Sequence, residues 1–207
     1  MPDHKDLKRL VRTRMTETGE NYTQARTALL AAPELEPMPA PWLVSGTHRA
    51  NYEAGLLPSA STYDGSRVVQ LRLRDGVADA VGFGTLMQSI SAGRYTGRRV
   101  RFAAAIRTRE VSDWAGLWLR VDTASGPHEI DNMHDRPLSQ TTQWQQALVV
   151  LDIPEEAASL HFGVLLSGAG AVDLAQPRFE EVGTEVPVTA KPPAPLPDEP
   201  QALNFGG

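Results

Sequence analysis

The strongest constraint on the fold is a regular succession of short β-type runs between residues 42 and 189. These runs are rich in β-branched and aromatic residues, and Gly, Asp, Ser and Pro separate them at fairly even intervals, which is typical of an all-β domain. The runs that we predict as strands are 42–44, 52–56, 68–73, 82–90, 99–108, 115–121, 145–153, 160–166 and 171–179. With no convincing internal helix, they favour a mainly β fold, an antiparallel two-sheet β-sandwich of the jelly-roll type.

The region before the strands has a helical pattern. Apolar side chains recur at helical spacing in two stretches of residues 5–30, and Thr18 and Gly19 interrupt them, so residues 1–32 are predicted to form a short helical hairpin. Thr18 or Asn21 is the expected cap of the second helix, because a short polar side chain can accept a hydrogen bond from an unpaired backbone N–H.

Proline-rich segments flank the β-rich region. Four prolines between residues 33 and 41 predict an extended linker, and five more in residues 190–207 predict a disordered tail. We therefore expect four parts: a helical segment 1–32, a linker 33–41, a ligand-binding β-sandwich 42–189 and the tail.

Composition excludes several classes of function. The chain of 207 residues has no cysteine, which excludes disulfides, thiol nucleophiles and cysteine-ligated zinc. The N-terminus lacks the apolar stretch of a signal peptide, and no apolar run approaches the length of a membrane-spanning helix, so we expect a cytoplasmic protein of bacterial type with no membrane contact. A net charge of −5 argues against a chain-wide grip on nucleic acid.

Motifs for metal or cofactor chemistry are missing from the sequence. No pair among the five histidines has the i, i+4 spacing of a helical metal site, and the glycines at 82, 84, 93 and 97 precede strands and do not open a helix. We find no G-x-S-x-G element for a serine nucleophile. We therefore expect no catalytic residue, no metal and no cofactor, although carboxylates and histidines leave catalysis open.

Two predicted strands carry a polar or aromatic face opposite an apolar one. Alternation along 99–108 separates a core face from a basic, shallow face that contains Arg101. Along 114–121, aliphatic residues fall on one side, whereas Trp114, Trp118 and Arg120 fall on the other. Aromatic rings beside arginine favour ligand binding, through stacking and oriented polar contacts. Ordinary packing of the two tryptophans under a loop is the competing interpretation.

Further polar groups could join the tryptophan-bearing face. Gln88 interrupts an apolar strand, and His161 alternates with an apolar set in another. Asp131 and Asn132 belong to a polar loop at residues 131–136. That loop is either a ligand contact or a turn that folds back on the sandwich, where these two side chains would be structural hydrogen bonders.

Two long stretches carry a family resemblance. Residues 82–122 and 131–174 resemble the jelly-roll domain that is joined to helix-turn-helix parts in some bacterial transcriptional regulators, including AraC-type proteins. Residues 42–74 resemble the first strands of carbohydrate-binding modules with a galactose-binding-like sandwich. The resemblance implies ligand recognition or regulation, and it identifies neither a ligand nor catalytic residues. A complete DNA-reading domain is missing, so we expect a stand-alone sensor or an accessory protein.

Three hypotheses about function follow. The leading one is a noncatalytic domain that binds a small polyhydroxylated or carbohydrate-like molecule, with possible regulatory use. The second is an enzyme of secondary metabolism, a hydrolase or cyclase, that uses Asp131, His134 or His161 for proton transfer. The third is an adaptor that binds another protein through residues 5–30, whose cations form a basic face; we expect no specific binding to nucleic acid.

Overall fold

The structure is a computed structural model that describes residues 4–30, 33–77 and 80–190, except for the side chains of 4–7, 10 and 27–30. The chain divides into two compact units, Met1–Leu35 and Glu36–Gly207. Among the described residues, no helix is both long and apolar enough to cross a membrane. The predicted tail starts at residue 190, and its residues 191–207 lie outside the described residues.

The first unit is the predicted pair of helices. Helix α1 (His4–Thr18) ends at Gly19, whose φ of +73° lies in the left-handed region that glycine tolerates. Helix α2 (Tyr22–Leu30) begins after Asn21, which is the cap: the Asn21 side chain accepts from the Gln24 N–H, and the Gln24 side chain accepts from the Asn21 N–H. Val11 and Ala25 are fully buried.

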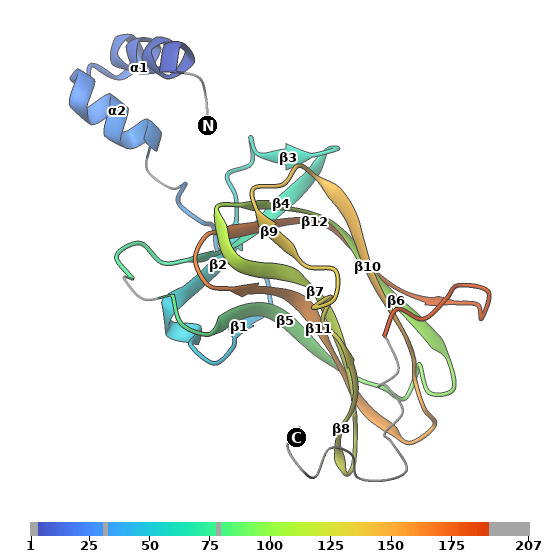
Figure 1. Cartoon of the computed structure of the whole chain (residues 1–207). Helices are drawn as coiled ribbons and strands as arrows, with labels where there is room; N and C mark the ends of the chain where they lie inside the picture. The colour runs from blue at the N-terminus through green and yellow to red at the C-terminus, as the bar shows by residue number, and fades with distance from the viewer. Residues whose placement is uncertain (1–3, 31–32, 78–79, 191–207) are drawn as a thin grey trace, which may run out of the picture. The chain divides into compact units, whose positions relative to one another are not determined.

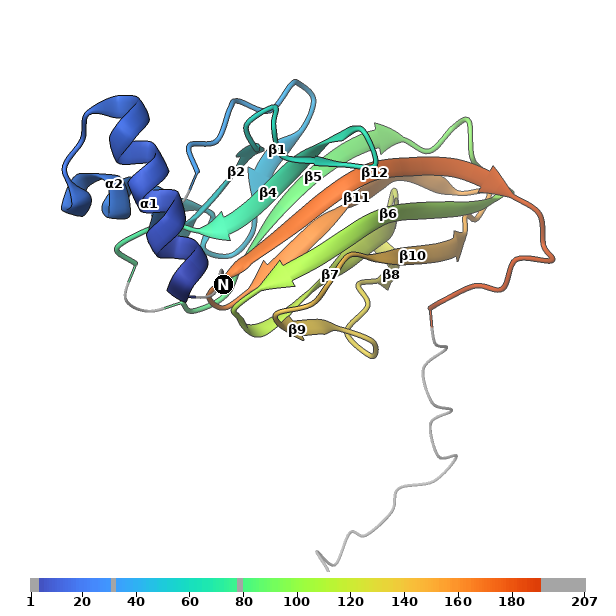
Figure 2. The same cartoon turned by 90° about the horizontal axis from the view of Figure 1, so that it is seen from above.

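The second unit is a β-sandwich (Figures 1 and 2). A short 3₁₀-helix, η1, covers Arg49–Asn51. The strands are β1 (Leu43–Ser45), β2 (Tyr52–Leu56), β3 (Thr62–Tyr63), β4 (Ser66–Leu73), β5 (Phe83–Ser91), β6 (Arg99–Arg109), β7 (Val111–Thr123), β8 (Gly126–Asp131), β9 (Leu138–Gln140), β10 (Gln145–Asp152), β11 (Ala157–Ser167) and β12 (Ala171–Val182).

The strands form two antiparallel sheets, as the sequence predicts. Sheet A has the order β10-β6-β12-β4-β2, with β3 added to β4, and sheet B has the order β1-β5-β11-β7-β8, with β9 added to β7. Figure 1 shows the two sheets in layers, and Figure 2 looks onto sheet A. Consecutive strands often lie in different sheets, so each sheet combines strands that are distant in sequence.

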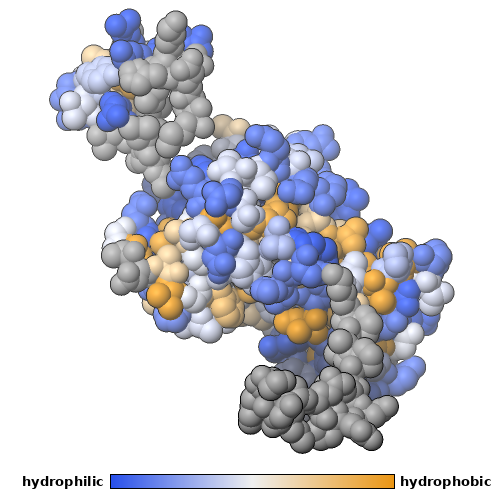
Figure 3. Space-filling view, in the orientation of Figure 1, coloured by the Kyte–Doolittle hydropathy of each residue, from blue (hydrophilic) through white to orange (hydrophobic). Residues whose placement is uncertain are grey.

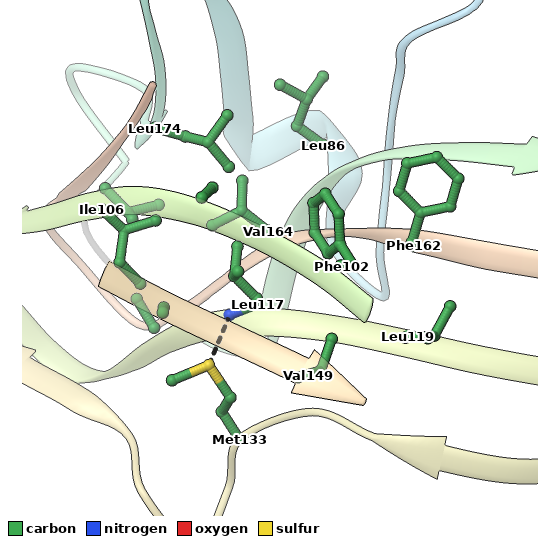
Figure 4. Packing of buried hydrophobic residues seen from close by; sticks show 14 of the residues in the cluster. Leu86, Phe102, Ile106, Leu117, Leu119, Met133, Val149, Phe162, Val164 and Leu174 are labelled. Carbon is green, nitrogen blue, oxygen red and sulfur yellow. Dashed lines mark hydrogen bonds between the residues drawn. The ribbon is translucent and has the colours of Figure 1, made fainter. Parts of the chain in front are cut away.

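The core lies between the inner faces of the two sheets. Strand β7 contributes Leu117 and Leu119, and strand β6 contributes Phe102 and Ile106, all fully buried. Figure 4 shows these side chains together, with Met133 reaching in from the loop after β8. Its sulfur accepts a hydrogen bond from the Leu117 N–H at 3.3 Å. Alternation of inward apolar and outward polar residues therefore produces this core. On the outside, hydrophilic side chains cover much of the face that Figure 3 shows.

Three strands and one segment differ from the sequence prediction. β3, β8 and β9 are additional, and β3 and β9 have only two or three residues, too few to show alternation. Residues 36–41, predicted as linker, belong to the sandwich unit. Glu36 exchanges backbone hydrogen bonds with Leu56, and Met38 packs against the core. Proline content alone could not distinguish a free linker from a segment that is fixed along a sheet edge.

Candidate functional site

The outer face of sheet B carries four of the predicted site residues. Strand register places Arg120 directly opposite His161, and Trp114 and Trp118 lie on the same face because they are separated from Arg120 by even numbers of residues. Trp118 is paired with Gly163, where an added Cβ would lie 2.1 Å from the Leu86 carbonyl oxygen. This close approach of neighbouring backbone explains why the position opposite Trp118 is glycine.

Trp118 does not lie on an open surface, contrary to the prediction. Its exposed fraction is 7%, and its indole N–H donates to the Thr85 hydroxyl at 2.8 Å. Because the ring spans from β7 toward β5, it covers the sheet and leaves little surface for stacking on a ligand. Trp114 is half-buried and makes an edge contact with His134, at 5.5 Å between ring centroids. The competing interpretation, ordinary packing, fits Trp118 better, and the contact with the 131–136 loop is made by Trp114.

A cluster of polar side chains surrounds His161 on the same face. His161 Nδ1 lies 2.7 Å from the Ser89 hydroxyl, and Nε2 lies 3.0 Å from the Ser159 hydroxyl. Nε2 also lies 3.3 Å from Asp122, which forms an ion pair with Arg120 at 2.8 Å. Burial lowers the pKa of His161 below its ordinary value; Asp122 opposes this shift, and Arg120 adds to it. The imidazole is therefore neutral at neutral pH.

The His161 cluster contains proton-transfer groups. Ser89, His161 and Asp122 form a chain of short contacts, which is the arrangement that activates a serine nucleophile. An acyl-transfer site needs, in addition, an oxyanion hole of free backbone donors beside the nucleophile. Ser89 belongs to β5, which pairs with β11 along its length but with β1 only at residues 85–87. The chain of side chains alone therefore does not define a catalytic site.

Asp131 and Asn132 have structural roles in the loop after β8. Asp131 is 5% exposed, accepts from the Met133 N–H at 2.9 Å, and pairs with Arg136 at 2.7 Å. It also accepts from the hydroxyl of Thr189, so it ties the loop to the segment after β12. The Asn132 side chain accepts from the His134 N–H. The low exposure of Asp131 and its three partners fit the structural role that the sequence offered as the alternative to ligand contact.

The same loop folds back on the sandwich, as the alternative interpretation expects. Met133 and Leu138 belong to the core cluster. Ile130 is the exception among the apolar residues in and beside the loop. It belongs to β8, and its side chain is 52% exposed.

Gln88 and Arg101 do not join the tryptophan-bearing face. Gln88 pairs with Phe162 and therefore shares the core-side face of sheet B with Leu119, since Phe162 also pairs with Leu119. Gln88 would face the tryptophans only if it stood one position earlier or later along β5, because alternate residues of a strand point to opposite faces. Arg101 is in β6 of sheet A, on the other side of the sandwich. Sequence alone could not assign predicted strands to one sheet or the other.

A second candidate site lies on the outer face of sheet A, where Arg101 is found. A depression of about 200 Å³ lies over strands β10, β6 and β12; its lining is Arg101, Ala103, Gln146, Ala147, Leu148, Gln176, Arg178 and Glu180. The register places Ala103 opposite Leu148 on one side and Arg178 on the other. The small Ala103 side chain leaves room between these two longer neighbours, as a ligand-binding surface requires.

An aromatic pair adjoins this depression. Trp144 directly precedes β10 and lies 4.5 Å from Tyr63 of β3, measured between ring centroids. The Arg107 guanidinium lies 4.7 Å from the centre of the Trp144 ring, close enough for a cation–π contact. Both rings are half-buried. Figure 1 shows β3 beside the segment that leads into β10. We call the depression and this pair together the sheet A site.

Buried polar residues fix Arg107 beneath the aromatic pair. Arg107 donates to Asp173 at 2.8 Å, and Asp173 accepts from the Gln70 amide at 2.7 Å. Asp173 is 4% exposed and Gln70 is 1% exposed, so each needs its partner. Together these contacts hold the arginine, and through it the Trp144 ring, in one orientation.

Part of the sheet A site was accessible to sequence reasoning. The basic, shallow face of 99–108 was predicted correctly, and Arg101 was selected from it. Trp144 was missed because it precedes the predicted strand, yet it has the same parity as Gln146 and so belongs to the outward face. Tyr63 had no comparable signal, since β3 has only two residues.

Comparisons with known proteins were made for the whole chain. No protein-family model matches it. The uncharacterized HTH-type transcriptional regulator YbfP of Bacillus subtilis (strain 168) is 40% identical over 172 residues, which cover 79% of this chain and 56% of that protein. This relative confirms the resemblance to bacterial regulators with helix-turn-helix parts.

Solved structures with a similar arrangement of strands have low sequence identity to this chain. A family 22 carbohydrate-binding module of Clostridium thermocellum Xyn10B has a TM-score of 0.47 and 14% identity, covering 72% of this chain and 89% of that one. TmCBM61, solved with β-1,4-galactotriose, has a TM-score of 0.45 and 17% identity, covering 69% and 90%. The jelly-roll assignment rests on the strand pairing of this chain. The chain spans little more than half the length of the curated relative that it matches.

Proposed function

We propose that the β-sandwich is a noncatalytic ligand-binding domain that takes a small polyhydroxylated, carbohydrate-like molecule at the sheet A site. The observation that carries this proposal is the aromatic pair of Tyr63 and Trp144 next to a depression with polar walls and an alanine between them. Carbohydrate rings have an apolar face that stacks on aromatic rings and hydroxyls that need oriented donors and acceptors.

The polar side chains of the depression match that requirement. Arg101 donates to Glu180 at 2.8 Å, and this pair offers both a donor and an acceptor to ligand hydroxyls. Gln146 and Gln176 line the same depression, and an amide side chain can donate and accept at once. These groups lie on β-strands, which hold a site more firmly than loops do.

A regulatory role is the second part of the proposal. It is supported by the 40% identical relative, whose name is that of an HTH-type transcriptional regulator. Ligand binding on a sandwich can influence a regulator only if the ligand has different affinities for two states of the protein. We infer that this domain supplies the ligand-binding part of such a system.

Titration of the purified full chain with a panel of neutral and acidic oligosaccharides tests the proposal. We expect Trp144→Ala to weaken binding by at least about tenfold, because a ring that stacks on the ligand supplies area and orientation that alanine lacks. Tyr63→Ala should have a similar effect. Trp114→Ala is the matched control, since Trp114 is also half-buried but lies on sheet B.

Thermal unfolding of each variant shows whether it remains folded. Equal affinity of the chain and a folded Trp144→Ala variant would contradict the choice of site. Failure of the chain to bind any member of a broad panel would contradict the ligand class. Loss of binding in Trp114→Ala alone would place the ligand on the outer face of sheet B, which the sequence predicted.

A further inference from the structure

The charges around the depression are paired, with one exception. Arg101 pairs with Glu180, and Arg107 pairs with Asp173, each at 2.8 Å. Arg178 also lines the depression and is exposed, and within the described part of the chain no carboxylate lies within 4.0 Å of it. Among the described residues, Arg178 is therefore the one cation of the sheet A site that no carboxylate balances.

A β-bulge directs Arg178 to this surface. The pairing of β12 with β6 shifts by one residue between Ala175 and Arg178, so Arg178 rather than Pro177 lies opposite Ala103. Gln176, in the bulge, has a φ of +51°, in the left-handed region where residues other than glycine are strained. Bulges occur next to binding sites, where they redirect a side chain.

The shift has a second effect, on the core. It sends Phe179 inward, where the ring lies 4.4 Å from that of Phe162, measured between centroids. The bulge thus supports core packing and the outward direction of Arg178 at once.

Arg178 lies at the far end of the site from the aromatic pair. Continuing the register by one residue places Trp144 opposite Arg107, whereas Arg178 is opposite Ala103. Four residues along a strand correspond to about 13 Å. A ligand that stacks on the aromatic pair and also reaches Arg178 must therefore be longer than one sugar ring.

We propose that the ligand of the sheet A site is an acidic oligosaccharide, with a carboxylate or sulfate group bound by Arg178. This inference rests on the proposed function. The guanidinium forms two parallel hydrogen bonds to a planar carboxylate, and it also binds sulfate oxygens. Such a contact is absent from a neutral sugar, so Arg178 selects for acidic members of the class.

Calorimetric titration with matched probes tests this selection. The probes are oligomers of galacturonate, glucuronate, mannuronate and guluronate, each compared with its neutral methyl ester, and sulfated galactan oligomers, compared with their desulfated form. We expect the acidic form to bind at least about tenfold more tightly than its neutral counterpart, because charge-assisted bidentate bonds are the strong ones. The favoured acidic series identifies the group as carboxylate or sulfate.

Variants assign the selection to Arg178. Arg178→Gln should abolish the preference for the acidic form over its neutral counterpart, and Arg178→Lys should keep part of that preference. Arg98→Gln is the control, because Arg98 is an exposed arginine that does not line the depression. The Arg178 variants carry no expected loss of folding, since the side chain is exposed.

The outcomes separate the two proposals. If the chain binds the acidic and neutral forms with equal affinity, the role of Arg178 is overturned. If Trp144→Ala then binds neither form, the proposed function is still supported. A preference that persists in Arg178→Gln would also overturn this inference. If neither form of any probe binds, the proposed function fails together with it.

Discussion

Leu119 and Trp118 are neighbours in β7 that lie on opposite faces of sheet B and are both buried. If Trp118 lined a ligand-binding face, as the sequence predicted, its replacement by alanine would spare much of the stability. The structure contradicts this, because the Trp118 ring covers the sheet and its N–H is bonded to Thr85. We expect Leu119→Ala to lower the free energy of unfolding by about 2–5 kcal/mol and Trp118→Ala by about 3–5 kcal/mol.

Urea denaturation measures both changes, and Trp114→Ala provides the comparison for a half-buried ring on the same face. A stable Trp118→Ala variant, within about 0.5 kcal/mol of the unchanged chain, would show that the ring is not part of the packing. It would then be available to a ligand, as the sequence suggested.

Helices α1 and α2 form a small unit of their own, joined to the sandwich unit at Leu35 and Glu36. The two helices have 15 and 9 residues, and isolated helices of such length are marginal in water. Deleting residues 1–35 should therefore remove little stability from the β-sandwich, whose core cluster consists of residues from Tyr52 to Leu174. The truncated chain should retain its cooperative thermal transition within a few degrees.

Truncation at residue 41 provides the contrast for that experiment. It also removes Glu36, which bridges Leu56, and Met38, which packs on the core. We expect this longer deletion to lower the melting temperature further. If the deletion of 1–35 abolishes the transition, the helices are part of the folding unit and the division is wrong.

Across the whole molecule, the fold could be predicted from sequence to a large extent because alternation is a local signal. All nine predicted strands are present, and β6 and β7 have the core faces that alternation assigned to them. The site was harder to predict, since it depends on which strands share a sheet. Trp118 and Arg101 belong to opposite sides of the sandwich, and sheet membership is decided by pairing between distant segments.

Short and irregular segments limited the prediction further. Tyr63 reaches Trp144 from a strand of two residues, and Arg178 faces the depression only because a bulge changes its parity. Regular alternation along β12 would have assigned Arg178 to the core side. Side chains on such irregular elements cannot be assigned to a face of the sandwich from sequence alone.

The central claim is that ligand binds on sheet A at the aromatic pair. The chain has four tryptophans, so the indole N–H region of a two-dimensional ¹H–¹⁵N NMR spectrum contains one signal for each. Single Trp→Phe variants assign these signals. On titration with an oligosaccharide that binds, we predict that the Trp144 signal shifts strongly and that the Trp114 and Trp118 signals stay in place. A shift of Trp114 or Trp118 with an unchanged Trp144 signal would contradict the account and place the ligand on sheet B.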